Sequence, residues 1–302
     1  MAQKSQRNPQ TRSWGGRRRE EGDLDLEFSH KINCRGKKDK NECSIQKVCS
    51  FRDGKYVMFD EKNSKIKLFD RHFNFLLDAA VPSDCRDMTY TSENEIALTQ
   101  QDSIIFVNVD DHRFKNSRKK FTIPGNSQCF GLVYGKSRLF VTCDIMDPDA
   151  TLRMMDMKGR IKLTIDSVRG LTENKDFGGF TRPFGKFLAI SDPSAKMGSI
   201  YLSDNEGSRV VCCDFSGNFQ WEVPMYDTPL GIASVRDYVI TCLDSNQLGL
   251  IHKDGHFVKT FPEMNFIPKN LFYDINNGKL LVTESGVSDF IHAYDIKISQ
   301  EN

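Results

Sequence analysis

The strongest constraint in this sequence is a pair of short apolar runs that recurs six times. The first run of each pair spans Lys55–Asp60, Asn94–Gln100, Ser137–Asp144, Gly198–Asp204, Asp237–Asp244 and Gly278–Glu284. The second run spans Ile66–Asp70, Ile104–Asp110, Leu152–Asp156, Val210–Asp214, Leu248–His252 and Phe290–Asp295. The runs are rich in Val, Ile, Leu and aromatic residues and lie between turn-forming residues, which is typical of buried β-strands.

The spacing of this repeat predicts the architecture. The second runs end at positions 70, 110, 156, 214, 252 and 295, so the successive intervals are 40, 46, 58, 38 and 43 residues. A period of about 40–50 residues is typical of a four-stranded propeller blade. Helical repeats of similar length would show apolar residues about 3.6 positions apart, and these runs do not. A further apolar stretch precedes each pair, and a turn with an outer strand follows it. We therefore predict an all-β, six-bladed propeller with four antiparallel strands in each blade.

The two ends of the repeat region fit together. The last repeat stops at Ile296–Ile298, with no residues left for its fourth strand, whereas Leu24–Cys34 lies before the first repeat as a spare strand. Pairing these segments would close the ring and remove an exposed sheet edge. We predict one propeller domain over residues 24–302. Residues 1–23 carry Gln, Asn, Ser, Gly and the basic run Arg17–Arg19, and we predict a disordered basic arm there.

Composition excludes several classes of protein. The chain has 302 residues, a formal net charge of +1 and 38% hydrophobic residues, as in an ordinary globular protein. No apolar run approaches the roughly 18–20 residues of a membrane-spanning helix, and the N-terminus lacks the apolar core of a secretory signal. The nine cysteines show no C-x-x-C spacing. They predict buried, reduced thiols and a cytoplasmic location. We expect no metal, no cofactor and no membrane partner.

Three segments point to a known family. They are Asp53–Asp60 followed by Ile66–Asp70, Ser199–Asp204 followed by Arg209–Asp214, and Thr228–Ile232 with its Pro-Leu-Gly-Ile sequence. Together they resemble the NHL-type propellers found at the C-terminus of tripartite-motif (TRIM) proteins, over roughly residues 24–302. The resemblance depends on six repeats in register, and His252 departs from it by replacing the repeated Asp.

The NHL resemblance implies a recognition platform for a protein partner or, in some members of the family, for RNA hairpins. Family members usually carry RING and B-box modules that give ubiquitin ligase activity. Those modules need closely spaced Cys and His ligands, which this sequence lacks. The implied function is therefore recognition, with a link to the ubiquitin pathway implied by the family, and the ligase chemistry is not carried over.

Two groups of residues are candidate binding sites. Basic residues on the loops expected to surround the central mouth could bind RNA phosphates or carboxylates of a partner; they are Arg86, Arg182, Arg209 and Lys269. Scattered solvated charge is the competing interpretation. The long interval contains a Gly-Gly loop whose aromatic and basic residues could anchor a protein partner; they are Phe177, Phe180, Arg182 and Phe184. Alternatively, these aromatic residues fill the seam between two blades.

The remaining motifs carry little chemistry. The basic run Arg113–Lys120 is interpreted as a solvated outer hairpin, with RNA or an acidic partner as the alternative. Asp144, Asp147 and Asp149 lack the pattern of a calcium loop. The six histidines are dispersed, and no hydrolase, P-loop or dinucleotide-binding motif occurs. The sequence therefore predicts a protein that is not an enzyme. A metal-dependent propeller hydrolase or lyase is the third possibility, by analogy of fold alone.

Overall fold

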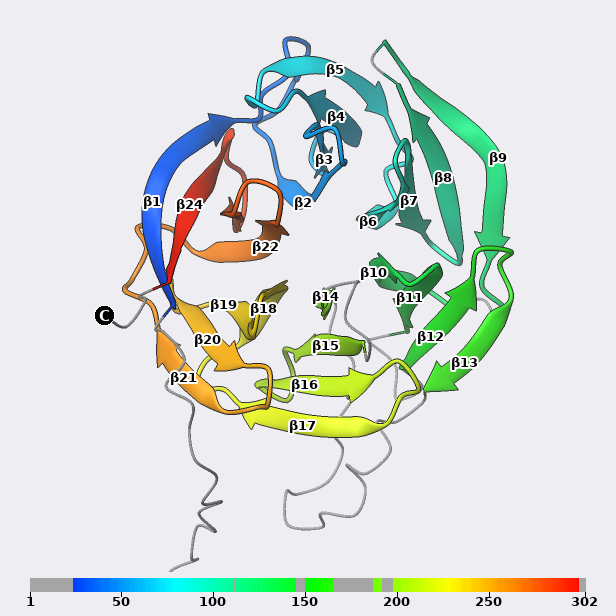
Figure 1. Cartoon of the computed structure of the whole chain (residues 1–302). Coiled ribbons are helices and arrows are strands. Elements are labelled where there is room, and N and C mark those ends of the chain that lie inside the picture. The colour runs from blue at the N-terminus through cyan, green and yellow to red at the C-terminus, as the bar shows by residue number, and fades with distance from the viewer. Residues whose placement is uncertain are drawn as a thin grey trace, which may run out of the picture.

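The computed structural model describes residues 24–110, 112–125, 127–144, 150–165, 187–191 and 198–298. These residues form six four-stranded antiparallel sheets arranged as the blades of a ring (Figure 1). Blades one to three are β2 (Ile45–Ser50), β3 (Tyr56–Asp60), β4 (Lys65–Phe69) and β5 (Phe75–Ala80); β6 (Cys85–Ser92), β7 (Glu95–Gln100), β8 (Ser103–Val109) and β9 (Phe114–Thr122); and β10 (Cys129–Gly135), β11 (Arg138–Cys143), β12 (Thr151–Asp156) and β13 (Ile161–Ile165).

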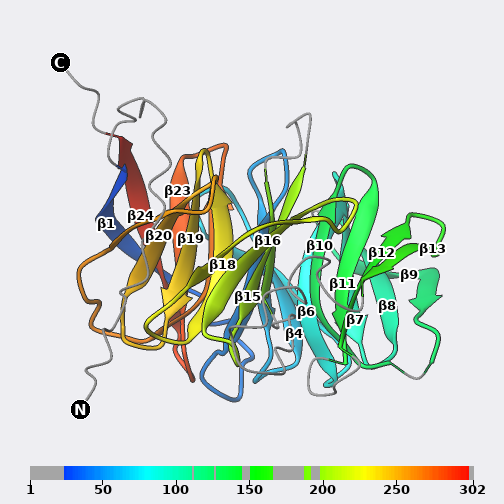
Figure 2. The same cartoon turned by 90° about the horizontal axis from the view of Figure 1, so that it is seen from below.

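The other three blades repeat this order. They are β14 (Phe187–Ile190), β15 (Ser199–Asp204), β16 (Arg209–Asp214) and β17 (Phe219–Pro224); β18 (Pro229–Val235), β19 (Tyr238–Leu243), β20 (Leu248–His252) and β21 (Phe257–Thr260); and β22 (Pro268–Asp274), β23 (Lys279–Glu284), β24 (Phe290–Ile298) and β1 (Leu24–Asn33). The strands cross the thickness of the ring, so the turns gather on its two faces (Figure 2). The predicted six-bladed propeller is confirmed.

The ring is closed by pairing its two ends. Strand β1 pairs antiparallel with β24, from Leu24 opposite Ile298 to Asn33 opposite Phe290. Figure 1 shows the blue N-terminal strand beside the red C-terminal one. The predicted closing strand is therefore confirmed, and it gives blade six its outermost strand.

The core lies in the six seams between neighbouring blades. Along β3, Tyr56 and Met58 pack against Leu281 of blade six, while the alternate residues Val57 and Phe59 pack in a cluster with blade two. Alternation of this kind follows from the two-residue period of a β-strand. Because both faces of each blade are covered, its middle strands are mostly apolar. This explains why they were visible as continuous runs in the sequence.

One glycine explains a motif of the sequence. A Cβ atom on Gly231 would lie 2.3 Å from Cα of Asn270 and 2.6 Å from the carbonyl oxygen of Lys269. The first strand of blade five therefore approaches that of blade six so closely that only glycine fits. This contact gives the Pro-Leu-Gly-Ile segment a structural role at the centre of the ring.

The basic run lies in the outer hairpin of blade two, as predicted, but it is not the solvated loop that was favoured there. Most of it belongs to β9, the outermost strand of blade two. Lys119 lies with its Nζ atom 3.2 Å from Oε1 of Glu95 and 3.8 Å from the ring centroid of Phe106. Lysines on an edge strand discourage pairing with another chain. The alternating charged residues of an edge strand look like a loop in sequence, and that misled the prediction.

Two other predictions can be compared with the structure. All nine cysteines are buried and none forms a disulfide. Within the described ranges, no helix is long and apolar enough to cross a membrane. The predicted arm at residues 1–23 lies outside the described residues, as do Asp147 and Asp149.

Candidate functional site

The starts of the innermost strands and the loops between second and third strands form one face of the ring, here called the mouth face. Arg86 and Lys269 are the second residues of β6 and β22, and Gln128 directly precedes β10. Each blade thus contributes to this face a position at the start of its innermost strand. Residues that are far apart in sequence are brought together there.

A cavity of about 330 Å³ opens beside the mouth between blades two and three, lined by Asp84, Arg86, Gln101, Asp102 and Gln128. The Nη2 atom of Arg86 donates a hydrogen bond to Oε1 of Gln128 at 3.0 Å. The guanidinium carbon lies 4.1 Å from the ring centroid of Phe130, which is a cation–π distance. Arg86 is thus held in place from two sides. The cavity offers one guanidinium, two carboxylates and two amides.

Near the centre of the ring, polar contacts connect neighbouring blades. Asp87 accepts bonds from the backbone nitrogens of Met88 and Leu132, both at 2.8 Å, and lies 3.6 Å from Nζ of Lys47. In the same layer, Nδ2 of Asn270 donates to the carbonyl oxygen of Gln46 at 2.6 Å. These polar groups are buried and connect different blades, so their first role is to hold the ring together.

The predicted site residues have different positions. Arg209 is buried: its Nε atom lies 2.9 Å from Oδ2 of Asp204 and its Nη1 atom 2.8 Å from Oε2 of Glu222. It is therefore a structural residue of blade four and does not face solvent as the prediction required. Lys269 is half-buried at the mouth. Four predicted residues lie outside the described residues: Phe177, Phe180, Arg182 and Phe184.

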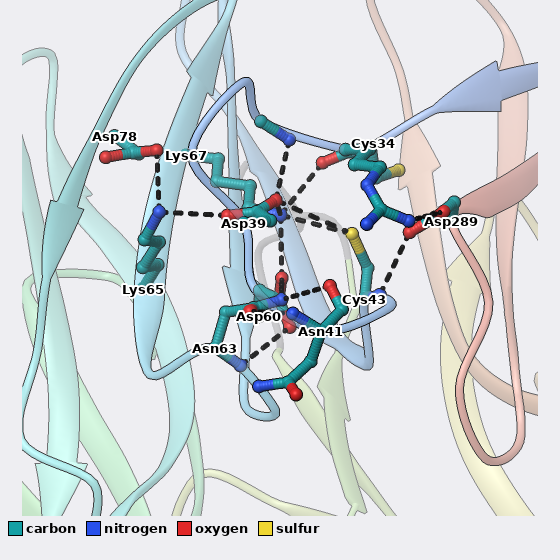
Figure 3. Close-up of polar contacts among 12 residues, drawn as sticks. Cys34, Asp39, Asn41, Cys43, Asp60, Asn63, Lys65, Lys67, Asp78 and Asp289 are labelled. Atoms are coloured by element: carbon teal, nitrogen blue, oxygen red, sulfur yellow. Dashed lines mark hydrogen bonds and ion pairs between the residues drawn. The ribbon is translucent and has the colours of Figure 1, made fainter.

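A buried charged cluster lies where the β1–β2 connection crosses blade one (Figure 3). The ammonium group of Lys67 donates to Oδ2 of Asp39 and Oδ2 of Asp60, both at 2.6 Å, to the carbonyl oxygen of Cys34 at 2.9 Å and to Sγ of Cys43 at 3.2 Å. Asp39, Cys43 and Asp60 form a set of donors that could hold a metal ion. The ammonium group already occupies the space between them, and the cluster acts as an internal ion pair.

The titration of this cluster follows from its contacts. Burial lowers the pKa of Lys67, but the hydrogen bonds and charges of Asp39 and Asp60 outweigh this and raise the pKa above its ordinary value. Burial raises the pKa of the Cys43 thiol to about 12. Lys67 therefore stays charged and Cys43 stays a thiol at neutral pH. Neither group is poised for acid–base or nucleophilic chemistry.

A third polar group lies on the opposite face, in the turn between β20 and β21. It contains His252, Asp254 and His256, whose ligand atoms lie within 4.8 Å of one another. Sequence reasoning treated the histidines as dispersed and missed this group. The signal was present, because a hairpin turn brings residues four positions apart side by side, and His252 already stood out as a replacement of the repeated Asp.

Comparison with known proteins supports the fold only. No known protein family matches the sequence, and neither does any curated protein. Virginiamycin B lyase from Staphylococcus aureus has a similar structure, with a TM-score of 0.60 and 16% identity, covering 92% of this chain and 90% of the lyase. A streptogramin B lyase gives 0.60 and 13%, covering 91% and 98% of the two chains. BamB from Moraxella catarrhalis gives 0.53 and 10%, covering 92% and 99%.

These matches contradict the prediction that the chain is not an enzyme, because two propellers of similar structure are lyases. At 16% and 13% identity they show the shared fold and assign no activity to this chain. The prediction depended on missing sequence motifs. A propeller builds its mouth from single residues on separate blades, so catalysis on this fold needs no contiguous motif. The comparisons do not support RNA binding. The NHL-type assignment stays a prediction beyond the shared propeller fold.

Proposed function

We propose that this propeller binds a protein partner through its mouth face, with the cavity around Arg86 as the centre of recognition. The observation that carries the proposal is the mixed charge of that cavity. Asp84 and Asp102 line the cavity together with Arg86, and Gln101 and Gln128 complete the lining. A polypeptide carries side chains of both signs and backbone groups that such a lining can match.

The same lining disfavours a nucleic acid. An RNA platform needs clustered basic residues that neutralise phosphates. Here the two carboxylates would repel phosphate groups close to Arg86, and Arg209 is already paired with Asp204 and Glu222. The mixed-charge cavity therefore supports a protein partner over RNA. The predicted resemblance to NHL-type recognition domains fits either kind of partner, so the choice between them depends on the cavity.

The volume of the cavity and the fixed position of Arg86 also favour binding of a partner side chain. A volume of about 330 Å³ lies at the lower end of the range for ligand sites, about 300–1,000 Å³, and can receive one or two side chains. Arg86 is fixed by Phe130 and Gln128 before any partner arrives, so little conformational entropy is lost on binding. We expect a charged side chain of the partner to insert here.

A displayed library of random peptides, selected against the full chain, tests this proposal. We expect selected peptides to lose at least about tenfold in affinity with Arg86→Gln or with Asp84→Asn combined with Asp102→Asn. Arg160→Gln is the matched control, because Arg160 is an exposed arginine in the β12–β13 turn on the opposite face. Equal binding by all variants would refute the proposal. So would tight binding of a hairpin RNA pool that falls steeply with salt.

A further inference from the structure

The turn between β20 and β21 places two imidazoles and one carboxylate around a single point. The Nδ1 atom of His252 lies 2.8 Å from Oδ1 of Asp254, and Nδ1 of His256 lies 2.5 Å from the same oxygen. The two imidazole rings are stacked, with centroids 4.8 Å apart and planes at 28°. Three ligand atoms of different side chains therefore converge from five consecutive residues.

The equivalent turn in other blades is built differently. In blade four, Oδ1 of Asp214 accepts hydrogen bonds from the backbone nitrogens of Ser216 at 2.7 Å and Asn218 at 2.9 Å. The carboxylates of Asp70, Asp110 and Asp156 cap their own turns in the same way. In blade five, His252 takes the place of that aspartate and the carboxylate sits two positions later. Nδ1 of His252 accepts a longer hydrogen bond from the backbone nitrogen of Asp254, at 3.4 Å, and Oδ1 of Asp254 accepts one from that of His256 at 3.3 Å. The turn is therefore capped more weakly than its equivalents and has a His-x-Asp-x-His arrangement.

The surroundings hold this turn in shape. Gly255 has a φ of +92°, and a Cβ atom there would lie 2.5 Å from the Trp221 ring. The indole nitrogen of Trp221 donates to the carbonyl oxygen of Lys253 at 2.8 Å. The Lys253 side chain forms an ion pair with Asp237, which neutralises its positive charge. Ligands fixed before binding lose little entropy when an ion arrives.

We propose that His252, Asp254 and His256 bind a borderline divalent metal ion, with Zn²⁺ as the representative. Zn²⁺ binds imidazole nitrogen and carboxylate oxygen at about 2.0–2.2 Å, and two His with one carboxylate is an established set of three protein ligands. Such bond lengths place neighbouring ligand atoms of a tetrahedron about 3.3 Å apart. The separations of 2.8 and 2.5 Å between the two imidazole nitrogens and Oδ1 of Asp254 would have to widen by about 0.5 and 0.8 Å to admit the ion.

The site is open on one side. The side chain of His252 is 10% exposed, while Asp254 and His256 are 60% and 62% exposed. An ion held there keeps at least one coordination position for water or for a ligand group of a partner molecule. The other candidate set, Asp39, Cys43 and Asp60, differs because Lys67 already fills it. A metal ion bound in the blade-five turn would therefore displace no buried cation, whereas one bound beside Asp39 would have to displace Lys67.

Titration of the full chain with Zn²⁺ by isothermal calorimetry, with elemental analysis after dialysis, tests the proposal. We expect one ion per chain. His256→Gln should weaken binding at least about tenfold, because loss of a supporting residue alone costs about 10–100-fold at metal sites. His252→Asn should do the same, because the asparagine side-chain oxygen can still accept the hydrogen bond of the turn but is a poor ligand for Zn²⁺. Circular dichroism without metal checks that both variants are folded.

The matched control is His72→Gln, an exposed histidine in the equivalent turn of blade one, which should bind Zn²⁺ as the unaltered chain does. A second readout is the ¹⁵N chemical shift of the ring nitrogens, which should move on Zn²⁺ addition for His252 and His256 but not for His72. No binding by the unaltered chain would overturn the proposal. Undiminished binding by both ligand variants would overturn it as well, since the ion would then lie elsewhere.

Discussion

The Nζ atom of Lys67 lies 2.6 Å from Oδ2 of Asp60, and neither side chain is exposed to solvent. A second carboxylate, that of Asp39 in the β1–β2 connection, lies at the same distance from the ammonium group. The ion pair therefore joins blade one to the segment that follows the closing strand. It lies beside the seam between the first and last blades, where a linear chain must be fastened to make a ring.

Removing the charge of Lys67 should destabilise the protein strongly. Lys67→Met leaves the buried Asp60 carboxylate without its ammonium partner and Asp39 with Lys65 alone. Breaking a buried ion pair costs about 3–5 kcal/mol. Urea denaturation measures this directly. Lys297→Met is the matched control, because Lys297 pairs with Glu27 on the surface and its side chain is 61% exposed. Similar unfolding midpoints for the two variants would show that the cluster adds nothing to stability.

The closing strand should matter more than the residues before it. Deleting 1–23 leaves β1 intact, and we expect almost no change in unfolding temperature. Deleting 1–34 removes the buried side chains of Leu24 and Ile32, each worth about 1.5–3 kcal/mol, and exposes the edge of β24. We expect a markedly lower unfolding temperature and aggregation on scattering measurements. Equal unfolding temperatures for the two truncations would contradict closure by β1.

The blades could be located well from the sequence, because the apolar run that marks a buried strand is a local feature of the sequence. Strands covered on both faces appear as apolar runs, and the predicted 55–60 and 66–70 agree with β3 and β4 to within a residue or two. The outer strand β9 escaped because one side of it faces solvent and its charges mask the alternation.

The candidate sites were harder to predict, because they depend on contacts between blades. Arg86 and Gln128 are 42 residues apart, and nothing in the sequence fixes their hydrogen bond. Arg209 looked like a surface arginine until its two carboxylate partners were known. The burial of Lys67 was not predicted either. A lysine is almost never fully buried unless it is paired, and the sequence of its apolar run does not show the paired carboxylates. Only three-dimensional proximity identifies such partners.

Gly231 should tolerate no side chain. Its Cβ would meet the backbone of Lys269 and Asn270, which cannot move without shifting blade six. We expect Gly231→Ala to destabilise the protein by about 1–3 kcal/mol, the usual cost of overpacking, in urea denaturation. Gly249→Ala in the same blade is the control, since its nearest neighbour is the flexible end of Met225 at 3.0 Å. An effect no larger than that of the control would mean that the two blades can separate at the mouth.

The free energy of unfolding should also fall in mild acid, because His292 is buried in the folded protein. This histidine is buried on β24, stacks on Phe266 at 3.9 Å and lies 2.7 Å from Oε1 of Glu284. Burial lowers the pKa of His292, and the Glu284 carboxylate only partly offsets this. The unfolded chain, with a histidine pKa of about 6.5, therefore binds the proton more readily than the folded chain. The free energy of unfolding that neutral His292 contributes is complete above about pH 6.5. It is lost as the pH falls toward the lower pKa of His292 in the folded chain.

Urea denaturation between about pH 8 and pH 5 measures this loss. We expect the free energy of unfolding to fall less steeply with decreasing pH in His292→Gln than in the unaltered chain, because glutamine does not titrate. His72→Gln, which alters an exposed histidine, should keep the full slope. If all three proteins gave parallel pH profiles, the burial of His292 would have no bearing on acid stability. A shallower slope in His292→Gln alone would identify the contact between β24 and the β21–β22 connection as an acid-sensitive part of the ring.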